Sequence, residues 1–184
     1  MTAKYVALLR GVNVAGTNKV KMDELRRLFA DLGHTEVSTY LQSGNVVFAP
    51  AASADADDRT GLAAGIEKAI ADRMGLTVTV LLRTRSELEK VLAANPYLDR
   101  ESDPAKLPVT FLAEPPDPGR AAALSIPAGE SAVFTLIGHE VYLHCPDGYG
   151  RTKLNNAFLE RKLGVAATTR NWKSVGALHE LLGD

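Results

Sequence analysis

The residues best suited to chemistry lie in a glycine-bearing stretch near the start of the chain, residues 10–21. Guanidinium and ammonium groups there donate charged hydrogen bonds, and amide side chains donate and accept neutral ones. Glycine lets a backbone approach a ligand closely. A long loop of this composition predicts one wall of an anion-binding site. Its candidate ligand-binding residues are Arg10, Gly11, Asn13, Gly16, Asn18, Lys19 and Lys21.

Gly11 and Gly16 have the spacing of the phosphate-binding loop of ATPases. That loop requires lysine and then serine or threonine directly after its second glycine. Here Thr17 and Asn18 follow Gly16, and lysine arrives only at Lys19. The pattern therefore argues against an ATPase-type loop, and the glycines are interpreted as permitting a tight backbone path.

A second group of polar residues lies in residues 39–48, where two β-branched and aromatic runs flank Ser43-Gly44. This pattern predicts a hairpin with a tight turn. Turn chemistry alone accounts for serine and glycine. An amide is not required at a strand end, so Gln42 and Asn45 are candidate ligand contacts together with Ser43.

Basic residues also stand near the starts of three predicted helices, where the helix dipole favours acidic ones. We hypothesise that these starts converge on one phosphate- or carboxylate-bearing ligand. Thr152 is the predicted cap of the fifth helix, and Thr168 or Thr169 that of the sixth. The alternative is that each charge is simply solvated. The C-terminal candidates are Arg151, Lys153, Arg170, Asn171, Trp172 and Lys173.

Trp172 is the only tryptophan, and packing of the last helix is favoured over stacking on a base or sugar. The four histidines share no metal-ligand spacing and Cys145 is the only cysteine, so no metal site and no cofactor are expected. For an enzyme of phosphoryl or acyl transfer, Ser43 and Tyr149 are the candidate nucleophiles.

Hydrophobic periodicity predicts the elements that position these residues. The first part of the chain shows strand, helix, strand, strand, helix and strand, the order of ferredoxin-like domains. The second part repeats strand, helix, strand, strand and helix. The predicted strands are 4–9, 37–41, 46–48, 77–82, 108–112, 131–137 and 140–144; the predicted helices are 22–32, 62–74, 86–94, 117–124, 154–164 and 175–182.

The expected fold is therefore α+β, with a ferredoxin-like βαββαβ half over residues 1–83 and a second similar half over residues 84–164. Residues 165–184 are expected to form a C-terminal helical extension packed on the body. A chain of 184 residues is long enough to bury a substantial core in this way.

Composition limits the classes of function. The formal net charge is −1, so nucleic-acid binding would require a local basic patch. No signal peptide opens the chain and no apolar run approaches the roughly 18 residues of a membrane span, so a cytoplasmic protein with no membrane partner is expected.

The two N-terminal groups resemble the hallmark of the domain of unknown function family 1697, and two C-terminal motifs resemble its other hallmark. The resemblance implies a bacterial protein of ferredoxin-like α+β character and no particular reaction. Ala15 stands where many members have glycine, which argues against a need for positive φ at residue 15. The motifs are residues 8–14, 19–22, 39–48, 151–154 and 168–175.

These observations favour a binding module for a phosphorylated small molecule or a nucleic-acid segment. The alternatives are the transferase enzyme and a protein–protein interaction module that uses a sheet face or edge. The oligomeric state is not predicted.

Overall fold

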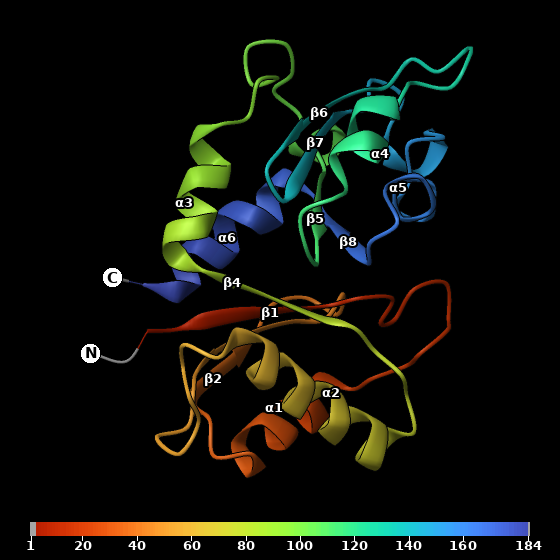
Figure 1. Ribbon diagram of the computed structural model, residues 1–184. Helices are drawn as coiled ribbons and strands as arrows, with labels where there is room; N and C mark the ends of the chain where they lie inside the picture. The colour runs from red at the N-terminus through yellow and green to blue at the C-terminus, as the bar shows by residue number, and fades with distance from the viewer. Residues whose placement is uncertain (1–2, 184) are drawn as a thin grey trace. The chain divides into compact units, whose positions relative to one another are not determined.

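The structure, a computed structural model, describes residues 3–183 and shows an α+β chain with two four-stranded sheets (Figure 1). All strand pairs in both sheets are antiparallel. Each sheet has the same connectivity, so the predicted repetition of pattern is confirmed as a repetition of topology.

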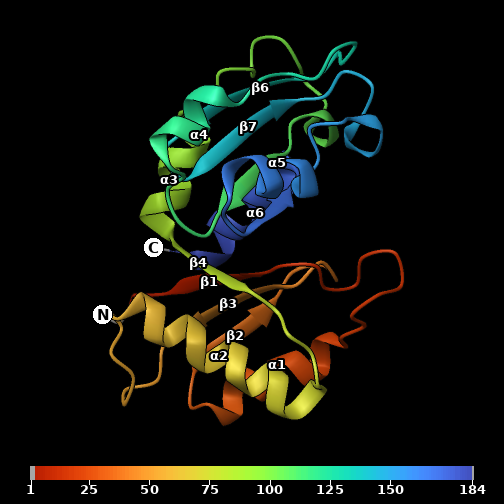
Figure 2. The ribbon, with the colours of Figure 1, turned by 45° about the vertical axis from the view of Figure 1, so that its right-hand side comes forward.

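The first sheet has the order β2-β3-β1-β4. The central strands β1 and β3 are buried along their whole length, whereas the edge strand β2 is more exposed and has a register irregularity. Helices α1 and α2 cover one face of this sheet (Figures 1 and 2). Its elements are β1 (Tyr5–Leu9), α1 (Met22–Asp31), β2 (Thr35–Thr39), β3 (Asn45–Ala49), α2 (Arg59–Met74) and β4 (Val80–Thr84).

Alternation along the strands directs one set of side chains toward the helices. Tyr5, Ala7 and Leu9 of β1 therefore share a core with the apolar stripes of α1 and α2. Gly33 and Gly75, at φ 91° and 66°, follow these helices in the left-handed region, as predicted for helix C-termini. The stripes consist of Leu25, Leu28 and Phe29 in α1 and Leu62, Ile66 and Ile70 in α2.

The second sheet has the order β6-β7-β5-β8, and α4 and α5 pack on one of its faces. Strand β8 contradicts the sequence-based prediction, which placed its residues in a helical extension. It pairs with β5 through Thr110↔Thr169 and neighbouring residues. The elements are β5 (Val109–Leu112), α4 (Pro118–Ala123), β6 (Val133–Ile137), β7 (Glu140–His144), α5 (Asn156–Leu163) and β8 (Ala167–Arg170).

The remaining elements are α3 (Arg85–Ala93), α6 (Trp172–Leu182) and the short 3-10 turns η1 (Pro104–Lys106) and η2 (Tyr149–Arg151). The chain divides into two compact units, one reaching to Glu89 and resuming at Leu178, the other formed by Lys90–Ala177. Domain boundaries at residues 83 and 164 stay a prediction.

Candidate functional site

The loop between β1 and α1 is a small hairpin of its own. The Asn13 amide donates to the Asn18 carbonyl oxygen at 3.1 Å, and that of Thr17 to Val14 at 2.9 Å. Ala15 and Gly16 form the turn, with φ of 49° and 79°. Positive φ at both central residues is the mark of a type I′ turn. Residue 15 thus does adopt a positive φ, contrary to the expectation from its alanine.

The side chain of Asn13 holds this hairpin in place. Its Nδ2 donates to the carbonyl oxygens of Val20 at 3.0 Å and Gln42 at 2.7 Å, and its Oδ1 accepts from the Val20 amide at 2.8 Å. Asn18 Nδ2 donates to the Gly11 carbonyl at 3.1 Å. The loop is therefore tied to itself and to the β2–β3 connection by side-chain bonds to backbone.

The β2–β3 connection approaches β1 closely. The Leu9 amide donates to the Gly44 carbonyl at 2.8 Å, and a Cβ at Gly44 would lie 2.8 Å from that of Leu9. Asn45 is 0% exposed, and its Nδ2 donates to the Tyr40 carbonyl and to Ser43 Oγ. Asn45 and Ser43 thus serve the turn, while Gln42 is exposed beside the loop.

A cavity of about 770 Å³ opens between the loop and the first turn of α1. Lys21 is the N-cap residue of α1, and its side chain makes no capping hydrogen bond. The first amide groups of a helix carry partial positive charge and need acceptors. Lining residues are Asn13, Gly16, Lys19, Val20, Lys21, Met22, Asp23, Glu24 and Gln42.

Within residues 3–183, α1 is the α-helix that begins without a side-chain cap. Asp58, Asp117 and Asn155 cap α2, α4 and α5. Asn171 Oδ1 accepts from the Ser174 amide in the first turn of α6. An uncapped helix start is therefore found at this cavity and at none of the other α-helices in that range.

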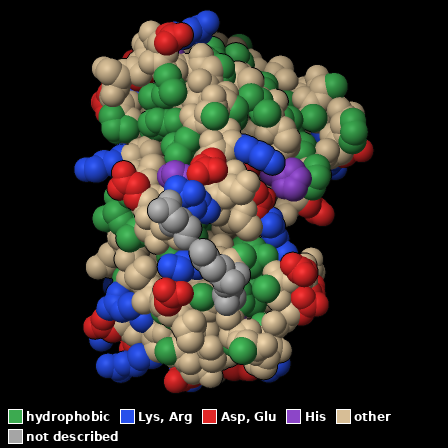
Figure 3. All heavy atoms as spheres, turned by 90° about the vertical axis from the view of Figure 1, so that its left-hand side faces the viewer, with side chains coloured by type: hydrophobic (Ala, Val, Ile, Leu, Met, Phe, Trp, Pro, Cys, Tyr) green, Lys and Arg blue, Asp and Glu red, His purple; other side chains and the backbone are tan. Residues whose placement is uncertain are grey.

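Charges in the cavity are mixed. Lys19 and Lys21 face a first turn that carries Asp23 and Glu24, and Asp23 is paired with Arg26. Arg10 is exposed at the end of β1, and its backbone amide donates to the Thr79 carbonyl at 3.0 Å. Figure 3 shows a different face, the left-hand side of Figure 1, and there too acidic and basic side chains are interspersed. The local positive charge thus comes from two lysines and the helix start.

The fifth helix begins later than its basic residues suggest. Asn155 caps α5, with its Oδ1 accepting from the Phe158 amide at 2.9 Å, so the prediction of Thr152 as the cap was wrong. Arg151 lies in η2 and is exposed. Lys153 is exposed, and its backbone amide donates to Glu130 Oε2 at 2.7 Å.

The sixth helix is also capped by a different residue. Thr168 and Thr169 lie in β8, so neither caps α6 as predicted, and Asn171 does so instead. Arg170 is only 6% exposed; burial lowers its pKa to about 10, and its Nη1 donates to Thr168 Oγ1 at 2.7 Å. Trp172 is half-buried and Lys173 exposed.

The convergence hypothesis rested on basic residues beside the backbone amides of three helix starts. No side chain caps the start of α1, whereas asparagine side chains cap α5 and α6. The candidates divide between the two compact units, with residues 10–45 in the first and residues 151–173 in the second. Ligand binding by the second group stays a prediction.

The candidate nucleophiles are engaged in structural bonds. Tyr149 Oη accepts from the Asn156 amide at 2.8 Å, and burial raises its pKa, so its hydroxyl is protonated at neutral pH. Ser43 Oγ accepts from Asn45. Cys145 is buried, and burial raises its pKa to about 11, so a thiolate is disfavoured.

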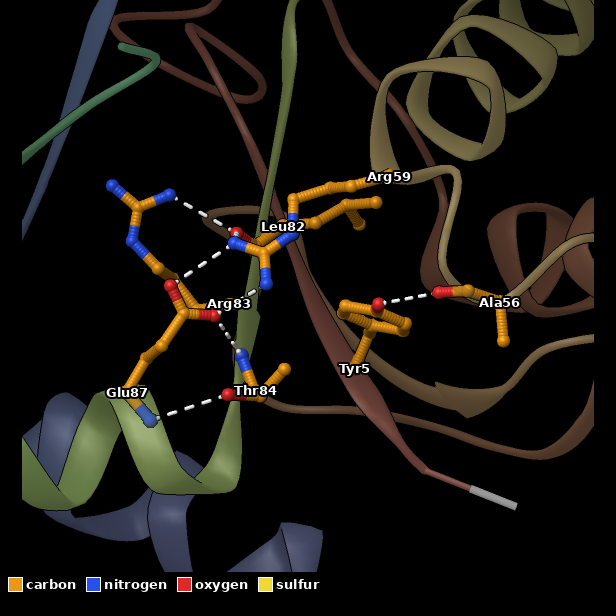
Figure 4. A network of polar contacts seen from close by, with 7 residues as sticks. All are labelled: Tyr5, Ala56, Arg59, Leu82, Arg83, Thr84 and Glu87. Carbon is orange, nitrogen blue, oxygen red and sulfur yellow. Dashed lines mark hydrogen bonds and ion pairs between the residues drawn. The ribbon is translucent and has the colours of Figure 1, made fainter. Parts of the chain in front are cut away.

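One charged cluster was not predicted from the sequence. Arg59 contacts both carboxylate oxygens of Glu87, at 2.7 and 3.0 Å (Figure 4). Thr84 and Glu87 form a reciprocal capping box at the start of α3, whose T-x-x-E signature is readable in the sequence. Burial opposes ionisation of Glu87, but the bonds from Arg59 and Thr84 outweigh it and lower its pKa. The cluster stabilises the α3 start.

In the part of the chain that the structure describes, no group of three or more His, Cys, Asp or Glu residues is arranged to hold a metal ion. Among the same residues, no helix combines the length and apolar character needed to cross a bilayer.

Comparisons with known proteins agree with the fold. The family described as "Protein of unknown function (DUF1697)" matches residues 1–142. A solved structure of the conserved bacterial protein SP0830 from Streptococcus pneumoniae is similar, with a TM-score of 0.74 and 25% sequence identity over 99% of each chain. A search of curated proteins found no match.

Proposed function

The chain belongs to the DUF1697 family of proteins of unknown function, and on that premise we propose that it is a binding module for a phosphorylated small molecule. The phosphate occupies the start of α1 between Lys19 and Lys21. The remainder of the ligand lies in the cavity beside Gln42 and the loop hairpin. A cytoplasmic, bacterial setting is part of the proposal, since the structural neighbour is a bacterial protein.

The uncapped start of α1 carries the proposal. Its N-cap is a lysine without a capping bond, and it opens on a cavity of about 770 Å³. Backbone amides at a helix start, reinforced by ammonium groups, form a ready phosphate site. The volume lies within the roughly 300–1,000 Å³ of ordinary ligand pockets.

A small molecule fits these observations better than a nucleic-acid strand. Duplex and single-strand binders align many cationic groups along the phosphate backbone. Here Lys19 and Lys21 are accompanied by Asp23 and Glu24, and the net charge of the chain is −1. Such a site can bind one phosphate group, whereas a row of phosphates along a strand would be repelled by the two carboxylates.

The test is a thermal-shift and calorimetric titration with inorganic phosphate, pyrophosphate, sugar phosphates and nucleotides. A true ligand gives a saturable rise in stability, about 2.7 kcal/mol at 100 times its dissociation constant. Lys19→Gln with Lys21→Gln removes both charges and weakens binding about a hundredfold or more, since each charged hydrogen bond contributes about 1.5–3 kcal/mol.

Lys68→Gln is the matched control, because Lys68 is an exposed lysine of α2 that does not line the cavity. It leaves the affinity unchanged. Absence of a shift with every phosphate compound, or equal weakening by the control, overturns the proposal. Binding of oligonucleotides with a steep salt dependence assigns the site to nucleic acid instead.

A further inference from the structure

A second cavity, of about 310 Å³, lies in the same unit between the end of α1 and the start of α2. Leu32, Leu62 and Ile66 provide apolar walls, and the segment before α2 contributes polar ones. This cavity is separate from the loop cavity, because the two share no lining residue. We call this second cavity the His34 groove.

His34 is the central polar residue of the groove. It is 7% exposed, and its ring packs against Phe29 and Phe48, with centroids 6.1 and 4.8 Å away. Its Nδ1 accepts a hydrogen bond from the Ala51 amide at 2.9 Å. Nδ1 therefore carries the lone pair, and in the neutral ring Nε2 carries the proton.

The Nε2–H group is available to a ligand. Among residues 3–183 it has no hydrogen-bond partner. The Nε2 atom also reaches solvent, because it is not one of the fully buried side-chain atoms that lack a hydrogen bond within that range. A donor at this position requires an acceptor atom on the ligand. The same tautomer rules out Nε2 as a metal ligand, because that role needs its lone pair.

The rim of the groove is acidic. Asp58 Oδ1 accepts from the Gly61 amide and Asp55 Oδ1 from the Asp57 amide, both at 3.0 Å. Each carboxylate thus has a second oxygen with remaining acceptor capacity. Among residues 3–183, no lysine or arginine lines this cavity. The rim therefore favours a cation.

Gly65 keeps the groove open. It lies inside α2, where glycine costs stability relative to alanine. A Cβ built there meets nothing within 4 Å, so packing does not demand glycine. A glycine at this position is explained if a ligand occupies the open space beside it.

From these observations we propose that the His34 groove binds a small organic cation, an alkylammonium group with a hydrogen-bond acceptor a few bonds away. The ammonium lies between Asp55 and Asp58, the acceptor takes the His34 Nε2–H bond, and the alkyl part contacts Leu62 and Ile66. The site is independent of the loop cavity, whose ligand has the opposite charge.

The test uses four probes of similar size on the full chain: 4-amino-1-butanol, n-butylamine, 1,4-butanediol and butyrate. Binding is followed through the NMR signals of the Gly61 and Gly65 amides and the His34 ring nitrogens. The amino alcohol produces saturable shifts and binds at least about threefold more tightly than butylamine. The diol and butyrate bind about tenfold more weakly, or not at all, because a charged hydrogen bond is lost.

Three variants locate the site. Asp55→Asn with Asp58→Asn removes the charge but keeps the cap, since asparagine caps helices well. It weakens amino alcohol binding about tenfold. His34→Phe abolishes the preference for the amino alcohol over butylamine. Gly65→Leu fills the groove and abolishes binding, whereas Ala64→Leu at the neighbouring exposed position does not.

Failure of the amino alcohol to bind the unaltered chain overturns the proposal. So does binding that persists in Gly65→Leu, or a stronger response to butyrate than to butylamine. Each variant is checked for a cooperative unfolding transition, and Ala64→Leu controls for the added side chain.

Discussion

The two halves of the molecule have the same strand order, yet they differ at the connection after their first strand. Residues 10–21 join β1 to α1, whereas residues 113–117 join β5 to α4. Strand-to-helix connections of about 2–6 residues are ordinary, so the second half shows what the topology requires. The loop of the first half is therefore longer than chain reversal requires.

The helices that follow differ in the same way. Asp117 caps α4 by accepting from the Arg120 amide at 3.1 Å, and proline occupies its first turn. Lys21 stands at the corresponding position of α1 and makes no capping bond. One half thus completes its helix start internally, and the other leaves it open beside a cavity. The following predictions test this contrast, beginning with the largest effect.

Gly44→Ala lowers the free energy of unfolding by about 2–4 kcal/mol, because it combines positive φ with overpacking against Leu9. Gly44 has φ 86°. The matched position in the second half is Gly138, at φ 59° with nothing within 4 Å of a built Cβ. Gly138→Ala loses only about 1 kcal/mol. Urea unfolding measures both, and equal losses contradict the close approach.

Asn13→Ala removes three side-chain bonds that hold the loop. The free energy of unfolding falls by about 2 kcal/mol, at roughly 0.5–1.5 kcal/mol per bond. Asn18→Ala, which removes one, loses about 1 kcal/mol. Phosphate binding at the cavity weakens in Asn13→Ala. An intact loop structure in that variant, seen by NMR, would show that the bonds are dispensable.

Glu87→Gln keeps the capping box of α3 but removes the carboxylate charge that faces Arg59. The carboxyl has a lowered pKa in the folded state, so its ionisation contributes stability above the unfolded value of 4.5. The loss is about 1 kcal/mol near pH 7, modest because the pair is partly exposed.

The difference in the free energy of unfolding between the unaltered chain and Glu87→Gln shrinks as the pH falls below 4.5 and through the folded-state pKa of Glu87. In that range the glutamate becomes neutral, as glutamine already is. Urea unfolding at a series of pH values measures it. Asp72→Asn, at an exposed i,i+4 pair with Lys68, is the control and shows a smaller change. A difference that grows toward acid contradicts the assignment.

Lys21→Ser gives α1 a side-chain cap, as Asp117 does for α4. It stabilises the chain by about 1 kcal/mol while weakening phosphate binding, and Asp117→Ala destabilises it by a similar amount. The opposite signs of stability and affinity at residue 21 distinguish a ligand site from an imperfect helix. Loss of stability in Lys21→Ser would mean that the lysine itself supports the fold.

Ala15→Gly relieves an alanine held at φ 49°. A gain of about 0.5–1 kcal/mol is expected, reduced by the extra freedom of glycine in the unfolded chain. Gly16→Ala, at φ 79°, gives a loss of about 1 kcal/mol. Thermal unfolding in parallel decides whether the type I′ turn is as described.

The sequence predicted most elements because their signals are local. The hairpin around Gly138-His139 and the helix opening at Asp117-Pro118 were both correct, since turn and cap chemistry depends on adjacent residues. Strand β8 was missed because Ala167–Arg170 is short and pairs with β5, far away along the chain. The prediction of Thr152 as a cap failed because Asn155, an equally good capping residue, lies closer to α5. The prediction of Thr168 or Thr169 failed because both lie in β8, and Asn171 caps α6.

The candidate site was predicted only in part. The loop of residues 10–21 was recognised by composition, but the bonds that commit Asn13 and Asn45 to the backbone depend on contacts between distant segments. Nothing in the sequence near His34 signals a ligand role, because its exposed donor is defined by the Ala51 bond and by the space beside Gly65.

The amino-acid sequence by itself determined the periodic elements, the glycine stops and the two repeated patterns, because these follow from side-chain alternation and backbone preference within a few residues. Only the tertiary structure decided which polar groups are consumed by the fold and which face open space. That distinction depends on which distant backbone groups approach each side chain. At the start of α1 and at His34 Nε2, polar groups remain open to a ligand, whereas similar side chains elsewhere are bonded to the chain itself.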